Sequence, residues 1–325
     1  MILSNQKTIL ITGGAGFIGS NLCEHFLNNG YKVKCLDNLL TGHKSNIEPF
    51  LSNPNFEFLE LDIRDYKSCL KASKGVDMIS HQAALGSVPR SIDNPIPTNE
   101  INAQGFLNML NAARENGVKR FVYASSSSVY GDSKESPKKE DDLGKPLSPY
   151  AVSKLTNELY GKIFHDLYGM EIIGLRYFNV FGKNQDPNGV YAAAIPKFIG
   201  LFLKGKAPTI HGDGNQTRDF TYIKNVIHAN EQALTIDNTK AFGKAYNVAC
   251  GTSYTLNTVI NVIKSALQKR GKNVSEIQPI YGKPRQGDIR DSLADITRIK
   301  TVLNYVVQTS FDEGMDEYIL NCYAI

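Results

Sequence analysis

Tyr150 and Lys154 lie four residues apart in the stretch SPYAVSK, residues 148–154. The stretch has a helical pattern with Pro149 at its entrance, so both side chains are predicted to share one helix face. A tyrosine with a pKa of about 10 is a poor base at neutral pH. A lysine ammonium one turn away stabilises the phenolate and is expected to lower that pKa. The pair could serve as a general acid and base, although this spacing alone arises by chance in many helices.

A run of four serines, Ser125–Ser128, ends a predicted strand shortly before this helix. A serine hydroxyl at the end of a strand could bind the oxygen of a reacting group while Tyr150 moves its proton. The serines alone could equally form a polar turn. Their value depends on whether the fold brings them to the same place as the Tyr150–Lys154 pair.

A glycine-rich turn, TGGAGFIG, follows the first predicted strand and opens a helix. It contains Gly13, Gly14, Gly16 and Gly19 at spacings that let backbone N–H groups approach a pyrophosphate. Asp37 ends the next predicted strand, 18 residues beyond Gly19, where a carboxylate can bind a ribose. An acid there accepts a hydrogen bond from the 2′-hydroxyl and repels a 2′-phosphate, so NAD is favoured over NADP. With a nicotinamide cofactor, Tyr150 and Lys154 would perform proton transfer alongside a hydride transfer.

Asp62 ends the third predicted strand, LELD. Its carboxylate would suit the adenine amino group of the same cofactor. A solvated carboxylate at the end of a strand explains the residue almost as well, and the sequence leaves both interpretations open.

The first half of the chain alternates short β-rich runs with helical stretches, a pattern typical of a parallel sheet with helices on both faces. We predict an α/β fold: a Rossmann-type doubly wound parallel sheet of about seven strands with a smaller C-terminal α/β lobe. The polar motifs follow strand ends, which in such sheets border the ligand crevice. Residues 1–180 are assigned to the NAD-binding domain. Residues 181–325 are assigned mainly to a substrate lobe, with a return to the sheet left open. Residues 207–223 are predicted to be hairpin-like, and helices are predicted near 223–236 and 255–270.

Composition excludes several classes of protein. The 325 residues are 42% hydrophobic and 21% charged, with a net charge of +4. No apolar run approaches the roughly 18–20 residues of a membrane span, and the N-terminus lacks a cleavable-signal pattern. Five dispersed cysteines read as reduced thiols, which favours the cytoplasm, and the six histidines show no metal-ligand spacing. The small basic excess lacks the dense block that nucleic-acid binding needs, and it suits an anionic small molecule.

Several motifs together are far more specific than the glycine turn. They are TGGAGFIGSNL, the Asp-Asn pair at 37–38, LDIRD, HQAA, YASSSSVYG, SPYAVSK, LRYFNVFG, GDGNQTRDFTYI and RQGDIRDSLAD. With these motifs the chain resembles the extended short-chain dehydrogenase/reductases, and within them the nucleotide-sugar 4-epimerases. The resemblance covers essentially the whole chain. It implies tightly held NAD, a UDP-sugar substrate and a homodimer, while the composition argues against a nucleic-acid or membrane partner.

The resemblance also implies roles for single residues. Ser126 and Tyr150 are expected to bind the sugar O4, and Lys154 is expected to bind the nicotinamide ribose and tune Tyr150. The implied cofactor-binding positions are Gly13, Gly16, Phe17, Ile18, Gly19, Asp37, Asn38, Gly42, Asp62, Ile63, Gln82, Ala83, Ala84, Asn102, Ser125, Tyr150, Lys154, Tyr177 and Val180. The implied substrate-binding positions are Ser87, Ser126, Ser127, Tyr150, Asn179, Ala194, Lys197, Arg218, Arg285, Asp288 and Ser292.

Departures from the family pattern narrow the expected activity. Sugar 4,6-dehydratases carry Thr-Asp-Glu before VYG, whereas this chain carries Ser126, Ser127 and Ser128. Serine cannot replace that acid pair, and the glutamate usual in sugar-acid decarboxylases is also missing. Ser292 matches the gatekeeper position, often tyrosine in epimerases confined to UDP-glucose and UDP-galactose. A small residue leaves room for a 2-acetamido group, although Ser292 could simply begin a helix, and such pocket differences are worth only a few kcal/mol.

The expected reaction is therefore 4-epimerisation of UDP-N-acetylglucosamine and UDP-N-acetylgalactosamine, with UDP-glucose and UDP-galactose as further candidates, through a transient 4-keto sugar. UDP-glucuronate epimerisation stays open and would use a cation near the sugar carboxylate, for which Arg90 is a candidate. Another NAD-dependent nucleotide-sugar oxidoreductase also stays open. A non-catalytic NAD-binding protein is disfavoured because Tyr150 and Lys154 are both present.

Two predicted helices, near 102–116 and 149–168, carry more apolar residues than one sheet face needs. These are Leu107, Leu110, Leu155, Leu159 and Ile163. The family resemblance implies that these helices pair across a two-fold axis, whereas the sequence alone does not distinguish this from packing within one chain.

Overall fold

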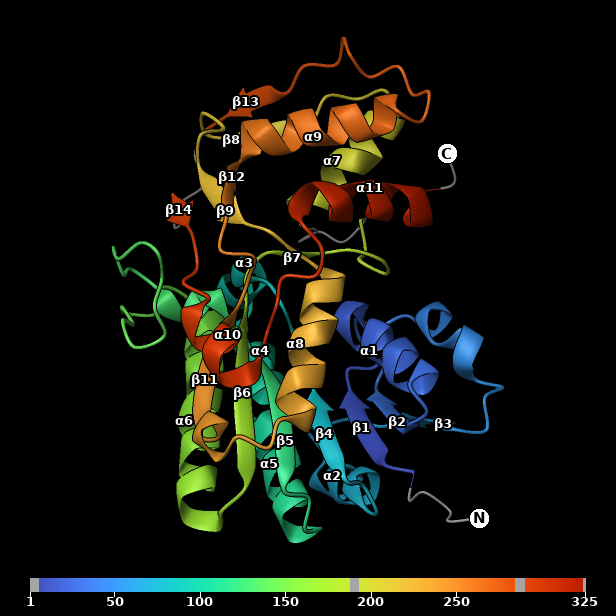
Figure 1. The fold of residues 1–325 in the computed structure, drawn as a ribbon, viewed down its shortest axis with the longest axis vertical. Helices are drawn as coiled ribbons and strands as arrows, with labels where there is room; N and C mark the ends of the chain where they lie inside the picture. The colour runs from blue at the N-terminus through green and yellow to red at the C-terminus, as the bar shows by residue number, and fades with distance from the viewer. Residues whose placement is uncertain (1–5, 188–192, 284–289, 324–325) are drawn as a thin grey trace.

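The computed structural model describes residues 6–187, 193–283 and 290–323. Its centre is a seven-stranded parallel sheet in the order β11-β6-β5-β4-β1-β2-β3 (Figure 1), which confirms the predicted fold class. The chain passes from β1 to β2 on one side and later to β4 on the other, so the strand order reverses beside β1. In doubly wound sheets the ligand crevice lies at that reversal. The strands are β1 (Thr8–Thr12), β2 (Lys32–Asp37), β3 (Phe56–Glu60), β4 (Met78–His81), β5 (Arg120–Ser126), β6 (Glu171–Tyr177) and β11 (Lys244–Val248).

Helices cover both faces of this sheet because the strands are apolar on both sides. In β1, Ile9 and Ile11 point into one core cluster and Leu10 into the other. The first cluster is closed by α1 (Phe17–Asn28) and α8 (Ile223–Thr235). The second is closed mainly by α2 (Tyr66–Ser73) and α5 (Phe106–Glu115), with α6 (Pro149–Tyr168) beside α5. Two short helices, α3 (Val88–Asp93) and α4 (Pro95–Asn99), lead through a wide helical turn, Glu100–Gly105, into α5.

The smaller lobe lies above the carboxyl edge of the sheet in Figure 1. Its helices include α7 (Ala194–Leu203), α9 (Leu256–Gln268) and α11 (Phe311–Cys322), while α10 (Thr297–Leu303) packs back against β11 and α8. Its strands form three small sheets. These pair β8 (Thr209–His211) with β13 (Ile280–Gly282), β9 (Thr217–Asp219) with β12 (Ser253–Thr255) and β14 (Asp291–Ser292), and β7 (Val180–Phe181) with β10 (Thr221–Tyr222).

The predicted hairpin within residues 207–223 is wrong. Strands β8 and β9 do not pair with each other: β8 pairs with β13, and β9 pairs with β12 and β14. Gly212 and Gly214 between them both have positive φ, 96° and 77°. Two such residues let the chain change direction, so the second strand enters another sheet instead of turning back on the first.

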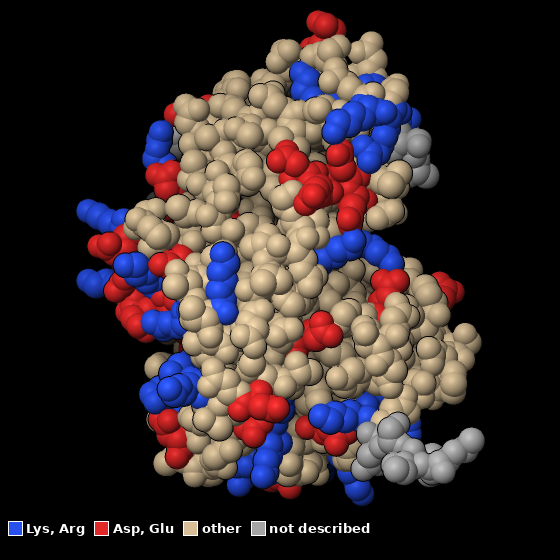
Figure 2. Space-filling model, viewed as in Figure 1, with Lys and Arg blue, Asp and Glu red and all other residues tan. Residues whose placement is uncertain are grey.

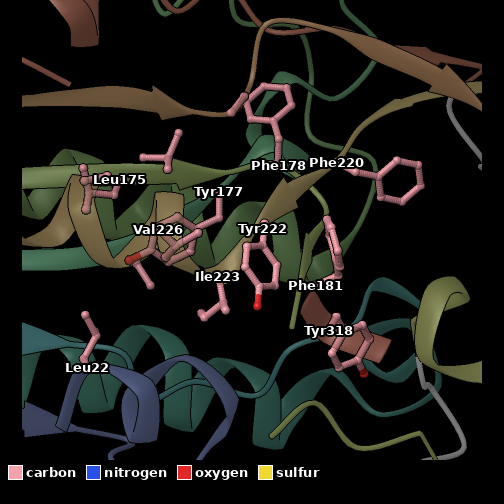
Figure 3. Packing of buried hydrophobic residues seen from close by; sticks show 14 of the residues in the cluster. Leu22, Leu175, Tyr177, Phe178, Phe181, Phe220, Tyr222, Ile223, Val226 and Tyr318 are labelled. Carbon is pink, nitrogen blue, oxygen red and sulfur yellow. The ribbon is translucent and has the colours of Figure 1, made fainter. Parts of the chain in front are cut away.

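The chain returns from the smaller lobe to the large sheet, where β11 pairs with β6 as an edge strand. The two units also share one apolar core, which runs from β1 and α1 to Phe198 and Ile263 of the lobe. Figure 3 shows part of this junction, where Phe181 lies between Tyr222 and Tyr318. The division at residue 180 stays a prediction.

Asp219, at the end of β9, ties three segments of the lobe together. Its fully buried carboxylate accepts hydrogen bonds from the backbone N–H groups of Cys250, Gly251 and Ala294, at 3.0, 3.0 and 3.4 Å. Burial raises the pKa of this carboxyl to about 6, against the opposing effect of those N–H donors. One side chain thereby fixes the base of the lobe to the chain that leaves β11.

One face of α6 remains apolar and exposed. Leu159 and Ile163 are 62% and 50% exposed, and Val152 and Leu167 continue the same face. The prediction of surplus apolar residues on the helices near 102–116 and 149–168 is only partly right. Leu110 is fully buried in the core, and Leu107 and Leu155 pack against the core. On the face seen in Figure 2, acidic and basic side chains are interspersed over a mostly uncharged surface. No helix among the described residues is long and apolar enough to cross a membrane.

Candidate active site

A cavity of about 430 Å³ opens at the carboxyl ends of the strands, at the point where their order reverses. It brings together residues from β2, β5, β6, α1 and α6 and from the turns after β1 and β4, and these residues lie up to 167 positions apart in the chain. All but one of the predicted cofactor-binding positions line it. These are Gly13, Gly16, Phe17, Ile18, Gly19, Asp37, Asn38, Gly42, Asp62, Ile63, Gln82, Ala83, Ala84, Ser125, Tyr150, Lys154, Tyr177 and Val180.

The glycine turn brings the start of α1 to the wall of this cavity. Gly16 is the N-cap of α1 and provides no side-chain hydrogen bond, so the first N–H groups of the helix are available to a pyrophosphate. Gly13 has a φ of 67°, and a Cβ there would lie 2.7 Å from the backbone nitrogen of Ala83. A Cβ on Gly19 would collide with the carbonyl oxygen of Gly13. The turn therefore needs glycine for close packing and fits a dinucleotide.

Asp37 lies at the end of β2, next to the glycine turn. Its carboxylate accepts hydrogen bonds from the backbone N–H groups of Ala15 (2.9 Å) and Leu39 (2.8 Å). Burial raises the pKa of Asp37, while those N–H groups lower it. These bonds fix the Asp37 carboxylate at the wall of the cavity.

Asp62 lines the same end of the cavity but has protein partners. Its carboxylate accepts hydrogen bonds from Asn38 Nδ2 (2.8 Å) and Arg64 Nη2 (2.6 Å). The hydrogen bonds from Arg64 lower the pKa of Asp62 to about 2. Asp62 is thus ion-paired at the wall of the cavity. This arrangement is compatible with binding of the adenine amino group and with a solvated carboxylate at the end of a strand.

At the other end of the cavity, the structure brings Tyr150, Lys154 and Ser126 together. Ser148 caps α6 by accepting a hydrogen bond from Ala151 N–H (3.1 Å), so the helix begins one residue before Tyr150. Lys154 is 3% exposed, and its ammonium donates to the carbonyl of Ala124 at 2.8 Å. The same ammonium lies 5.8 Å from the centre of the Tyr150 ring. The serine-ended strand and the tyrosine-bearing helix therefore meet in one site.

The expected lowering of the Tyr150 pKa is not found in the protein alone. Burial raises the pKa of Tyr150, and a hydrogen bond with Ser126 opposes it only in part. Burial also lowers the pKa of Lys154 to about 8, against the charge of Glu158. Desolvation penalises phenolate and ammonium alike, so in the protein alone burial shifts both groups toward their neutral forms. The positive charge of an oxidised nicotinamide would favour the phenolate.

The floor of the cavity is held by a polar network that reaches α8. Tyr177 donates to Gln82 Oε1 (3.1 Å) and accepts from Asn230 Nδ2 (2.9 Å). Asn230 also accepts from Gln82 Nε2 at 3.1 Å. Asn102, the remaining predicted cofactor position, does not line the cavity. It is buried, and its side chain bonds both backbone groups of Leu85, so it supports the wall from behind.

A second cavity, of about 270 Å³, lies against the first on the side of the smaller lobe. Asn179 and Val180 line both. The predicted substrate residues Ala194, Lys197 and Arg218 line the second cavity. A molecule extending from Tyr150 past Asn179 would therefore enter a chamber that contains two cationic side chains.

The other predicted substrate positions lie elsewhere. Ser87 caps α3 by accepting from Arg90 N–H, and Ser127 follows β5, but neither lines the two cavities. Ser292 pairs with Arg218 across β14 and β9 and does not line them either. Arg285 and Asp288 lie outside the described residues.

Sequence reasoning missed most of the lining of the second cavity. The missed residues are Phe181, Ala193, Ile195, Phe198, Thr209, Ile210, His211, Gln216, Phe220 and Leu256. They come from separate segments of the chain, and only the tertiary fold brings them together. Asn230 could have been noticed as a polar residue on the apolar face of a helix, since its neighbours Val226, Ala229 and Ala233 are all buried.

The fold and this site define an NAD-binding α/β enzyme, and the comparisons give the family. The model of the NAD dependent epimerase/dehydratase family matches residues 9–249. The chain therefore belongs to this family, and its cofactor is NAD. The predicted resemblance is confirmed.

Three relatives illustrate the match. A UDP-N-acetylglucosamine 4-epimerase structure from Methanobrevibacter ruminantium, in complex with UDP-N-acetylmuramic acid, is 38% identical with a TM-score of 0.89, and 97% of each chain is covered. A UDP-glucose 4-epimerase of Mycolicibacterium smegmatis is 34% identical over 94% of this chain and 95% of its own. A UDP-glucuronic acid 4-epimerase structure from Bacillus cereus is 30% identical with a TM-score of 0.87, over 96% and 97%. These relatives are isomerases, and the prediction of an isomerase is confirmed.

Proposed function

We propose that the protein is a 4-epimerase that interconverts UDP-N-acetylglucosamine and UDP-N-acetylgalactosamine, with UDP-glucose and UDP-galactose as further substrates, through a transient 4-keto sugar. One observation carries the proposal. The cavity that has Asp37 and the glycine turn at one end has Ser126, Tyr150 and Lys154 at the other, beside a second chamber that contains Lys197 and Arg218. This continuity suits a dinucleotide and a nucleotide-sugar that meet at Tyr150.

The residues would divide the work as follows. Bound NAD would supply reversible oxidation at C4 of the sugar. Tyr150, as a phenolate, would take the O4 proton and later return it, while Ser126 would hold O4 by a hydrogen bond. Lys154 would keep Tyr150 ionised. Lys197 and Arg218, with Arg285, would hold the diphosphate while the sugar turns its other face to the cofactor.

Two points support an N-acetylated sugar. Ser292 pairs with Arg218, which lines the second cavity, and a serine there is smaller than the tyrosine often found at this position in epimerases confined to UDP-glucose and UDP-galactose. The structural relative with 38% identity is a UDP-N-acetylglucosamine 4-epimerase.

UDP-glucuronate is the second candidate. Arg90 lines the same cavity as Ser126 and Tyr150, where a cation could meet a sugar carboxylate. Two of the similar solved structures are UDP-glucuronic acid 4-epimerases.

We further propose that two copies of the chain associate through the exposed apolar face of α6 as a homodimer. The cytoplasmic location expected from the sequence also stays a prediction.

The test is to incubate the purified protein with each of three sugar nucleotides, UDP-N-acetylglucosamine, UDP-glucose and UDP-glucuronate, and to follow the anomeric protons by NMR. We expect a galacto-configured product from the acetylated sugar, formed faster than from the other two. Tyr150→Phe should lower this rate by about 10²–10⁴-fold, since it removes the acid–base group. No conversion of any sugar, with NAD supplied, would overturn the proposal.

A matched variant tests the choice of sugar. Ser292→Tyr should reduce conversion of UDP-N-acetylglucosamine while conversion of UDP-glucose is retained. Loss of space is expected to discriminate between the two sugars by roughly 10–200-fold. Equal effects on both sugars would contradict the assigned role of Ser292 and leave the reaction itself supported.

A further inference from the structure

Behind the Tyr150–Lys154 pair, a third polar side chain of α6 faces the sheet. Glu158 is four residues beyond Lys154, so both lie on one helix face. Its carboxylate accepts a hydrogen bond from Ser125 Oγ at 2.5 Å, and from Arg176 Nε and Nη2 at 2.9 and 2.7 Å. The side chains of Glu158 and Arg176 are 10% and 4% exposed. A buried carboxylate is thus shared between the strand end of the active site and one arginine.

Arg176 is itself held in place from the other side. Its Nη1 donates to Tyr130 Oη at 3.0 Å and to the carbonyl of Glu140 at 2.8 Å. The guanidinium also lies over the Tyr130 ring, 5.1 Å from its centre. Glu158 has little freedom to move, because leaving Arg176 would strand a buried charge.

Two atoms of the active site are fixed by this arrangement. Ser125 is 2% exposed, and because its hydroxyl hydrogen is donated to Glu158, only its acceptor lone pairs can face the cavity. The neighbouring carbonyl of Ala124 accepts from Lys154 Nζ. The end of β5 is therefore fastened to α6 at two consecutive residues.

The charges around Lys154 make Glu158 the stabilising anion. Tyr150 and Glu158 of α6 face Lys154. His81 of β4 also faces Lys154, and burial keeps His81 neutral with a pKa of about 3. Arg176 and Tyr177 come from β6, and Arg176 is paired with Glu158. Among these groups of the described chain, Glu158 raises the pKa of Lys154 against the effect of burial.

We propose that Glu158 is a positioning residue: clamped by Arg176, it orients Ser125 and supplies from behind the negative charge that keeps Lys154 an ammonium. The inference rests on the proposed function, in which Lys154 stabilises the Tyr150 phenolate. A merely structural ion pair would join the same two elements, so the test must separate charge from structure.

The test removes each partner in turn. Glu158→Gln keeps the shape but removes the negative charge, whereas Arg176→Met leaves that charge without its arginine. In the first variant the high-pH fall in epimerisation kcat should move to lower pH, by on the order of one pH unit. In the second it should stay or move to higher pH, because the unpaired carboxylate holds the Lys154 proton more tightly. If the Glu158–Arg176 ion pair were only structural, both variants would lose the same activity. Their pH profiles of kcat would not move in opposite directions.

A second measurement does not depend on epimerisation. The affinity of each variant for NADH, followed by fluorescence across pH, should weaken as Lys154 loses its charge in the cofactor cavity. This weakening should begin at lower pH in Glu158→Gln than in the unmodified protein and Arg176→Met. If the Glu158→Gln variant unfolds, a double variant takes its place. This variant combines Glu158→Gln with Arg176→Met and so buries no unpaired charge. Unchanged pH dependence overturns the inference, whereas a wild-type protein that converts no sugar overturns only the proposed function.

Discussion

Lys154 has two requirements that conflict. It must be buried to approach Tyr150 and the cofactor, yet burial disfavours its charge and lowers its pKa to about 8. The same burial disfavours the Tyr150 phenolate. The pair therefore depends on outside charges, a fixed carboxylate on one side and the oxidised cofactor on the other.

This balance predicts the pH dependence of the reaction. As pH rises through about 8, Lys154 should lose its proton, and kcat should fall. The loss of the Lys154 proton would not cause this fall in kcat by unfolding the protein. The folded pKa of Lys154 lies below the ordinary value of 10.5, so the unfolded chain binds more protons in that window and this group's contribution to stability rises with pH. The check is kcat from pH 6 to about 10 together with the melting temperature. A kcat that stays constant to the end of this range would contradict the assignment.

At the scale of elements, the turn between β1 and α1 depends on close backbone contact. Helix propensity favours alanine over glycine by about 1 kcal/mol. At Gly19 the clash with the Gly13 carbonyl should outweigh that gain.

Gly19→Ala should therefore abolish retention of NAD and lower the melting temperature. Bound cofactor is measured by absorbance after release from the purified protein. Gly200→Ala in α7 is the matched control, because a Cβ there meets nothing within 4 Å and should leave NAD content unchanged. Full NAD occupancy in Gly19→Ala would show that the turn can shift.

For the whole molecule, the exposed apolar face of α6 bears on the oligomeric state. A large apolar face exposed on one helix usually marks an interface. Leu159→Glu should give a monomer by light scattering, because it places a charge in the middle of that face. Leu320→Glu on α11, an equally exposed leucine at 64%, should leave the assembly intact. A wild-type monomer would refute the proposed homodimer.

The sequence predicted positions best where strand ends and helix spacing determine them. The glycine turn, Asp37, Ser126, Tyr150 and Lys154 all line the predicted cavity, because strand ends and helix spacing determine their places. It failed where tertiary contacts decide. β8 and β9 look like two arms of one hairpin, and only their distant partners separate them. Leu110 reads like Leu159, yet one is core and the other surface. Glu158 lies outside the motifs, and Arg176 lies within LRYFNVFG without a role being predicted for it. Their ion pair joins two elements, so the sequence alone did not reveal it.

The return of the chain through β11 affects synthesis on the ribosome. The first six strands of the sheet are complete by residue 177, but the strand that covers the edge of β6 begins only at Lys244. At roughly 5–20 residues per second, the ribosome needs several seconds for the intervening segment. During that delay β6 presents an uncovered edge bearing Ile173 and Leu175, which are buried in the finished fold. During this period the edge of the nascent chain can pair with another chain unless a chaperone covers it. Slower translation of residues 178–243 should therefore increase aggregation.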